Sequence, residues 1–158
     1  MKKNKLFWNI FLIVAIFLTD RVTKYSMINL SSKSEETNII ITSYLSFNLI
    51  WNEGIAFGLL SFDHKTYYNF LTILIIIITL IILWMIIRTE RFERLAFIMV
   101  FGGSLGNIFD RLFYSAVPDF IDFHIKNFHW FIFNVADIFI TIGVVMLIYH
   151  ELFKKNKV

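Results

Sequence analysis

The sequence predicts an all-α integral membrane protein with four transmembrane helices and a small extracytoplasmic β-rich element, and three observations support this class. First, the chain of 158 residues is 58% hydrophobic, above the half that is usual for a soluble domain. Second, its apolar residues form runs of about the 20 residues that a helix needs to cross the hydrocarbon core of a bilayer. Third, basic residues cluster beside these runs, which is the pattern that sets membrane topology.

The whole chain, 1–158, is expected to form a single membrane domain. Its four expected spans, in chain order, are 6–25, 67–87, 95–113 and 130–152. The second span is the clearest because it contains no charged residue, whereas the other three carry polar side chains near one end.

The segment 38–60, between the first two spans, is expected to be an outer β-rich loop. Its first part, NIIITSYLSFNLIW, is rich in β-branched and aromatic residues with partial alternation, which is typical of strands. Asn52-Glu53-Gly54 then predicts a turn.

Lysine and arginine positions predict that both termini are cytoplasmic. The two tails and the loop between the second and third spans hold most of the basic residues outside the spans: Lys2, Lys3, Lys5, Arg88, Arg91, Arg94, Lys154, Lys155 and Lys157. The other two loops hold Lys33, Lys65 and Lys126. Three further basic residues lie at outer helix ends, against this trend, and are expected to pair with acids inside the protein: Arg21, Lys24 and Arg111.

Three acids from three helices are predicted to reach one level, near the outer edge of the hydrocarbon. At a rise of 1.5 Å per residue, Asp20, Asp110 and Asp137 lie roughly 22–25 Å from the inner surface. Asp20 and Lys24 are spaced i, i+4, which favours a structural ion pair on the first helix. The motif Gly102-x-x-x-Gly106 favours close packing of helices, which would bring Asp110 near its neighbours.

Asp137, three residues after Asn134, is the strongest functional candidate. A carboxylate inside the membrane costs roughly 2.5–3.5 kcal/mol on insertion scales, so such residues usually face the bundle interior and serve a function. The alternative is an interfacial acid that contacts headgroup water. Asn107 and Asp110 repeat the spacing on another helix face, and with Arg111 they form either part of the same site or an ordinary helix end.

Two more acids, Asp119 and Asp122, lie in the apolar segment VPDFID just outside the third span. From the residues alone, Asp110, Asp119 and Asp122 all stay open as partners of Asp137. Two carboxyl groups held close together share one proton, because both cannot easily ionise. The ionised group can take a proton from an attacking water while the protonated group polarises a peptide carbonyl. Such a pair predicts an aspartic-protease reaction, which needs no cofactor.

Other chemistries find little support in the residues. The chain has no cysteine, and its histidines lack a metal-binding spacing such as His-Glu-x-x-His; they are His64, His124, His129 and His150. We therefore expect no metal site. The net charge of +3 is modest and indicates topology signals rather than a nucleic-acid partner.

Five motifs together resemble the bacterial lipoprotein signal peptidases, the type II signal peptidase family. They are Asp20-x-x-Thr23-Lys24, Asn52-Glu53-Gly54-Ile55-Ala56-Phe57, Gly103-Ser104-Leu105-Gly106-Asn107-Ile108-Phe109-Asp110-Arg111, Val117-Pro118-Asp119-Phe120-Ile121-Asp122 and Phe133-Asn134-Val135-Ala136-Asp137. Each motif is weak alone, but their order and spacing on four spans are highly specific together.

The resemblance implies a membrane-embedded aspartic endopeptidase that cleaves the signal peptide of prolipoproteins just before the diacylglyceryl-modified cysteine. It implies Asp119 and Asp137 as the catalytic pair, and so it prefers Asp119 over Asp110. It implies that further residues support the site or contact substrate: Asp20, Lys24, Asn52, Gly54, Asn107, Asp110, Arg111 and Asn134. Pro118 and Ile55 differ from the residues usual in the family and bear on specificity.

The resemblance also implies a location in the bacterial cytoplasmic (inner) membrane with the site at the outer face. The expected partners are diacylglyceryl-modified prolipoproteins, membrane lipid and the cyclic-peptide inhibitor globomycin, and a monomer is favoured. Two other classes remain as alternatives: a small proton-coupled transporter that uses the same acids as a relay, and a non-enzymatic assembly or scaffold protein. The transporter is disfavoured because the acids gather at one face instead of crossing the membrane.

Overall fold

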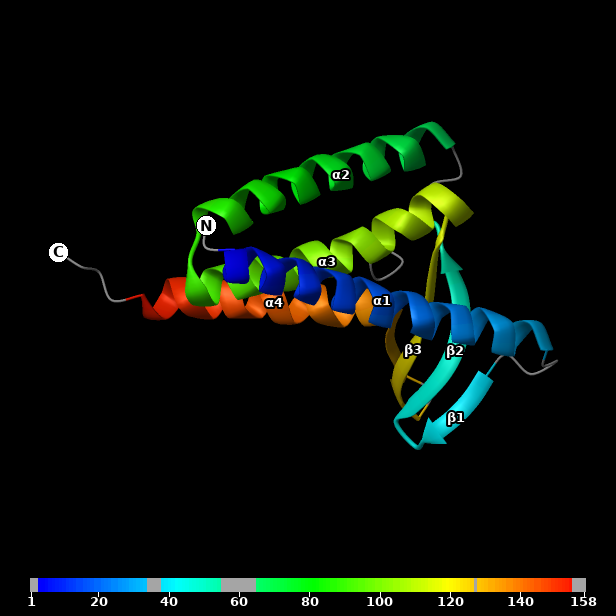
Figure 1. Cartoon of the computed structure of the whole chain (residues 1–158). Helices are drawn as coiled ribbons and strands as arrows, with labels where there is room; N and C mark the ends of the chain where they lie inside the picture. The colour runs from blue at the N-terminus through cyan, green and yellow to red at the C-terminus, as the bar shows by residue number, and fades with distance from the viewer. Residues whose placement is uncertain (1–2, 34–37, 55–64, 127, 155–158) are drawn as a thin grey trace.

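Helices and one antiparallel sheet make up the computed structural model, which describes residues 3–33, 38–54, 65–126 and 128–154. The helices in this part of the chain are α1 (Lys3–Lys33), α2 (Lys65–Arg88), α3 (Arg91–Tyr114) and α4 (Val135–Phe153). The strands are β1 (Asn38–Thr42), β2 (Leu45–Asn52), β3 (Val117–Ile125) and β4 (Phe128–Phe133). The helices run alongside one another and the sheet lies at one end of them (Figure 1).

Each expected span corresponds to a helix, and the four helices of the described residues are long and apolar enough to cross a membrane. α1 is longer than the expected 6–25 and continues to Lys33. The fourth helix begins later than expected, because 130–133 belong to β4. The segment FHWFIF is rich in aromatic residues, which favour a strand, and Asn134 then caps the helix.

α3 contacts each of the other three helices. Small residues make this approach possible, as the sequence predicts. A Cβ atom built on Gly103 would lie 2.5 Å from the backbone oxygen of Ala136 on α4. One on Gly102 would lie 2.9 Å from the Ile16 side chain on α1. The glycines therefore let α1 and α4 pack closely around α3.

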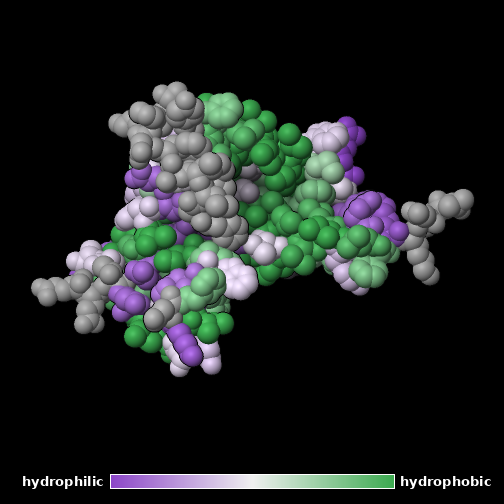
Figure 2. Space-filling view, turned by 180° about the vertical axis from the view of Figure 1, so that it is seen from behind, coloured by the Kyte–Doolittle hydropathy of each residue, from purple (hydrophilic) through white to green (hydrophobic). Residues whose placement is uncertain are grey.

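Apolar side chains also cover the outside of the helices. On α2, for example, Ile73, Ile77 and Ile81 are exposed. In Figure 2, hydrophobic residues form a broad area over the helices, and hydrophilic residues gather toward the sheet and at the opposite end. An outer surface of this kind is suited to contact with lipid, since a soluble protein rarely exposes such large apolar areas.

The sheet is a meander in the order β1-β2-β3-β4. It packs against the second half of α1, where Met27 is buried with Phe120 and Ile121 of β3. β1 and β2 correspond to the strands expected in 38–60, of which 55–60, including Ile55, lie outside the described residues. β3 and β4 were not expected from the sequence, and they carry one face of the site.

Candidate active site

Asn134 and Asp137 begin α4 as a reciprocal helix cap. The side-chain oxygen of Asn134 accepts a hydrogen bond from the Asp137 N–H at 3.1 Å, and the Asn134 N–H donates to Asp137 Oδ2 at 3.1 Å. This capping box satisfies amide groups that the start of a helix leaves without partners. The three-residue spacing seen in the sequence is therefore explained by the cap, which also fixes one oxygen of the Asp137 carboxyl.

The other oxygen of Asp137 is held by α3. Asn107 Nδ2 donates to Asp137 Oδ1 at 2.8 Å. Asn107 Oδ1 accepts from Lys24 Nζ at 2.9 Å and from Asn134 Nδ2 at 3.2 Å. Since the oxygen of this amide faces two donors, its nitrogen must face the carboxyl group.

Asp119 lies on β3 and is only 2% exposed. Its Oδ1 accepts from Asn134 Nδ2 at 2.5 Å, and its Oδ2 accepts from Asn52 Nδ2, at the end of β2, at 2.8 Å. Burial, followed by repulsion from the Asp137 charge, raises the pKa of Asp119 from 3.8 to about 7, although the amide hydrogen bonds oppose this shift. A carboxyl group with this pKa can hold or release a proton near neutral pH.

Asp119 and Asp137 line one small cavity of about 20 Å³. A cavity needs roughly 10–15 Å³ to hold one water molecule, so this space fits a single water. The remaining lining residues are polar apart from one: Asn52, Asn107, Arg111, Val117 and Asn134. The two carboxyl groups therefore share a space in which a water can lie between them.

Arg111 spans two parts of the site. Its Nη1 donates to the backbone oxygen of Asn107 at 3.2 Å, and its Nη2 donates to the backbone oxygen of Gly54 at 3.1 Å. The Gly54 N–H in turn donates to Asn52 Oδ1 at 2.9 Å. Arg111 Nε is buried without a hydrogen-bond partner among the described residues, so this side chain keeps a free donor beside the cavity.

Asp110 and Asp20 are held by basic side chains of α1. Lys24 Nζ lies 2.6 Å from Asp110 Oδ2 and 3.0 Å from Asp20 Oδ1. Arg21 lies 2.5 Å from Asp110 Oδ1 and 2.7 Å from Asp20 Oδ2. The expected pairing of Lys24 and Arg21 with internal acids is confirmed, and it extends from α1 to α3. Arg111, for which the same pairing was expected, instead donates to the backbone oxygens of Asn107 and Gly54. Asp20 Oδ1 also accepts from the Ala136 N–H at 3.0 Å, which ties α1 to the first turn of α4.

The three acids that the residues left open as partners of Asp137 thus have different surroundings. Asp110 pairs with Arg21 and Lys24, and Asp122 pairs with His129. Neither lines the water-sized cavity. The contact between Asp122 and His129 was not foreseen, because it depends on the unexpected strand β4.

A larger cavity of about 330 Å³ extends from Asp137 along α4. Most of its lining is apolar and comes from β4 and α4: Phe131, Phe133, Ile138, Ile140, Thr141 and Ile142. An elongated apolar segment placed here would meet Asp137 directly.

A family model and related sequences indicate one family, and a solved membrane enzyme has a similar fold. The family model described as "Signal peptidase (SPase) II" matches residues 12–153. A lipoprotein signal peptidase of Pelagibacter ubique (strain HTCC1062) is 49% identical over 149 residues, covering 94% of this chain and 90% of that protein. A lipoprotein signal peptidase of Francisella tularensis subsp. novicida (strain U112) is 39% identical over 150 residues, covering 92% of each. A solved structure, "Bacterial membrane enzyme structure by the in meso method at 2.3 A resolution", has a TM-score of 0.73 and 31% identity, covering 95% of this chain and 91% of that one.

Proposed function

Because the chain belongs to the signal peptidase II family, we propose that it hydrolyses its substrate as an aspartic endopeptidase through Asp119 and Asp137. Its function is that of a multi-pass membrane protease that removes signal peptides from lipoprotein precursors. The transporter alternative receives no support from the relatives. We further propose that cleavage takes place just before the diacylglyceryl-modified cysteine.

The observation that carries the proposal is the water-sized cavity lined by both carboxyl groups. The charges around it support one shared proton. Asp20 and Asp110 are already paired with α1 side chains, and among the residues that line the cavity Arg111 is the one cation. One positive charge beside two carboxyl groups favours one ionised and one protonated member.

We propose that the pair begins the reaction with its single proton on Asp119, the carboxyl group that lies on β3. Asp137 then takes a proton from the cavity water as the water oxygen attacks the carbonyl carbon of the scissile peptide bond. Asp119 gives its proton to the carbonyl oxygen, which forms a tetrahedral diol. The diol collapses as the C–N bond breaks: the proton held by Asp137 passes to the leaving amine, and one diol hydroxyl returns its proton to Asp119 as the new carboxyl group forms. Water, one peptide bond and the pair's single proton account for every atom in this sequence.

The apolar cavity beside Asp137 is the proposed binding site for the substrate. The hydrophobic part of a signal peptide would lie along α4 and present the peptide bond that follows it to the pair. We propose that Arg111, which lines the water-sized cavity, orients the scissile peptide through its positive charge. The remaining supporting residues act by holding the acids, Asn52, Asn107 and Asn134 through direct hydrogen bonds.

We propose that the site faces the outer side of the bacterial inner membrane, that both termini are cytoplasmic and that the protein acts as a monomer. Globomycin would bind across Asp119 and Asp137 and compete with the lipid-modified precursor.

The decisive experiment measures cleavage of a diacylglyceryl-modified precursor by purified protein in lipid nanodiscs. Asp119→Asn and Asp137→Asn should each lower kcat by at least about 10³-fold, because removal of one member of a catalytic unit abolishes most of its effect. Glu151→Gln, an exposed acid near the end of α4, is the matched control and should cleave normally. Turnover close to wild type in either aspartate variant would refute the assignment.

A further inference from the structure

We propose that Asp122, His124 and His129 form a binding site for a divalent transition-metal ion, with Zn²⁺ as the best match. The three residues lie on the β3–β4 hairpin, and they do not line the catalytic cavity. Their candidate ligand atoms, one from each residue, all lie within 4.8 Å of one another.

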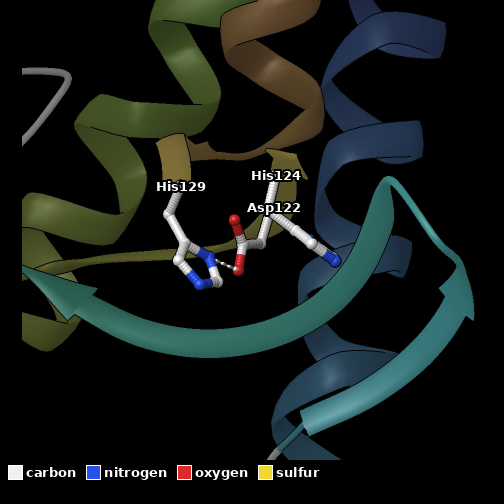
Figure 3. Close-up of side chains that lie close together, drawn as sticks. All are labelled: Asp122, His124 and His129. Carbon is white, nitrogen blue, oxygen red and sulfur yellow. Dashed lines mark hydrogen bonds and ion pairs between the residues drawn. The ribbon is translucent and has the colours of Figure 1, made fainter. Parts of the chain in front are cut away.

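Strand pairing brings these residues together. His124 of β3 is directly opposite His129 of β4, and Asp122 lies two residues before His124 on the same strand. The two imidazole rings have centroids 5.2 Å apart, and His129 Nδ1 lies 2.8 Å from Asp122 Oδ2. Figure 3 shows the Asp122 carboxylate drawn between the two rings, with a dashed line to His129.

Two buried atoms of this cluster lack partners. Asp122 is 1% exposed, yet its Oδ1 has no hydrogen-bond partner among the described residues, and the same holds for the buried Nδ1 of His124. Besides His129, Asp122 has a long contact of 3.4 Å with Ser46 Oγ. Buried polar groups are normally satisfied, so a carboxylate oxygen and an imidazole nitrogen left without partners in one cluster point to a ligand that accepts electron pairs from both residues.

The donor set and spacing suit zinc. Two imidazole nitrogens and one carboxylate oxygen are common zinc ligands, whereas Mg²⁺ and Ca²⁺ prefer oxygen alone. In a tetrahedral site with bonds of about 2.0 Å, ligand atoms lie about 3.3 Å apart. The observed separations, from 2.8 Å to at most 4.8 Å, reach this value with small side-chain rotations. A water can complete the fourth position.

An ion can reach the site from the surface, and its binding would link two strands. His124 lines a cavity of about 490 Å³, and His129 has a side chain that is 53% exposed. A bound ion would cross-link β3 to β4. β3 carries Asp119, and Asn134 directly follows β4, so the ion would stiffen the hairpin that holds the site. The absence of a metal-binding spacing in the sequence does not oppose this proposal, because the ligands meet through cross-strand pairing.

The test uses the full chain, purified without a histidine tag and treated with a chelator. We expect Zn²⁺ to bind with one-to-one stoichiometry by calorimetry and to raise the Tm, whereas Mg²⁺ does neither. His124→Gln and His129→Gln should each weaken Zn²⁺ binding by about 100-fold or more, since even the loss of an outer-shell partner costs 10–100-fold. His150→Gln is the matched control, because His150 lies at the other end of α4 beside Glu93, at 3.1 Å.

X-ray absorption of the loaded protein should show two histidine nitrogens and further nitrogen or oxygen ligands on zinc. A simple hydrogen-bonded hairpin predicts a different result: the two variants lower the Tm, and Zn²⁺ changes nothing in the wild type. That result, or Zn²⁺ binding that is equal in wild type and in both variants, would overturn the proposal.

Discussion

Asn134 contacts both carboxyl groups of the proposed pair through different atoms. Its side-chain nitrogen donates to Asp119, its backbone N–H donates to Asp137, and its side-chain oxygen accepts from the Asp137 N–H. One residue therefore serves as helix cap and as a positioning group for two acids. These roles can be separated, because a serine can cap a helix but cannot place an amide nitrogen on Asp119.

Asn134→Ala and Asn134→Ser should separate the two roles. The alanine variant loses the cap and should lose about 0.5–2 kcal/mol of stability together with activity. The serine variant should recover most of the Tm but stay at least about tenfold below wild type in kcat, because the donor to Asp119 is still missing. Thermal unfolding and precursor cleavage, measured on the same samples, check this. Full recovery of activity in the serine variant would contradict it.

The raised pKa of Asp119 carries a cost in stability with a defined sign. An unfolded chain ionises this carboxyl group near pH 3.9, whereas the folded protein retains the proton to about pH 7. Between these values the folded state binds more protons, so the contribution of Asp119 to stability falls as pH rises from about 4 to about 7.

Asp119→Asn should therefore unfold at a higher Tm than wild type at pH 8, while being inactive. The gain is of the order of 2–4 kcal/mol less about 1 kcal/mol for one lost hydrogen bond. At pH 4.5 most of the gain should be absent, because the cost grows with each pH unit above the unfolded pKa and pH 4.5 lies less than one unit above it. Tm values at the two pH values decide this, with Glu151→Gln as control. A Tm difference that is the same at both would argue against a raised pKa.

At the scale of elements, α3 organises the molecule because its glycines admit two neighbours. At Gly103 the backbone of α4 lies where a side chain on α3 would be, since a Cβ at Gly103 would meet the backbone oxygen of Ala136. The approach to α1 is less tight, since a Cβ at Gly102 would lie 2.9 Å from Ile16 Cγ2 and 3.0 Å from Ile16 Cβ. The first contact cannot adjust without moving α4, which begins with the capping residue of the site.

Gly103→Ala should destabilise the protein by about 1–3 kcal/mol through overpacking, and it should lower kcat because the start of α4 shifts. Gly102→Ala, its neighbour on the same helix, should have a smaller effect, because its Cβ would approach Ile16 at 2.9 Å instead of 2.5 Å and alanine favours a helix by about 1 kcal/mol over glycine. Tm and kcat of both variants test the difference. Equal changes in Tm and kcat would contradict the prediction that the α3–α4 contact tolerates an added methyl group less well than the α3–α1 contact does.

At the scale of the whole molecule, charge and architecture agree on one orientation. The start of α1, the turn between α2 and α3 and the end of α4 lie at one end of the molecule, opposite the sheet (Figure 1). That end carries Arg91, Arg94 and Lys154, which favours a cytoplasmic location. The sheet and the proposed catalytic pair then lie on the outer side, where a translocated precursor and water are both available.

Single cysteines can test this orientation directly, because the chain has none of its own. In intact spheroplasts, Lys126→Cys at the end of the β3–β4 hairpin should react with a membrane-impermeant maleimide. Glu90→Cys, an exposed position between α2 and α3, should react only after the membrane is permeabilised. The reverse pattern would place the site on the cytoplasmic side.

Local patterns in the sequence were enough for the four spans, the first two strands and the internal pairing of Lys24 and Arg21. Hydrophobic run length and charge clustering are set by short-range composition and by the thickness of the bilayer. Residues 130–133 of the strand FHWFIF fall within the expected fourth span, because a short apolar run next to an apolar helix has no boundary signal except its cap.

Which carboxyl group shares a cavity with Asp137 was decided by tertiary structure, although the family motifs already favoured Asp119. Asp110 is occupied by two cations from α1, and Asp122 turns to His129 across a hairpin. Asp119 meets Asn52 because β2 pairs with β3, a contact between residues 67 positions apart. The sequence by itself determined which segments form helices long and apolar enough to cross a membrane. The partners of those acids depend on strand register and helix packing between distant segments, which no local pattern encodes.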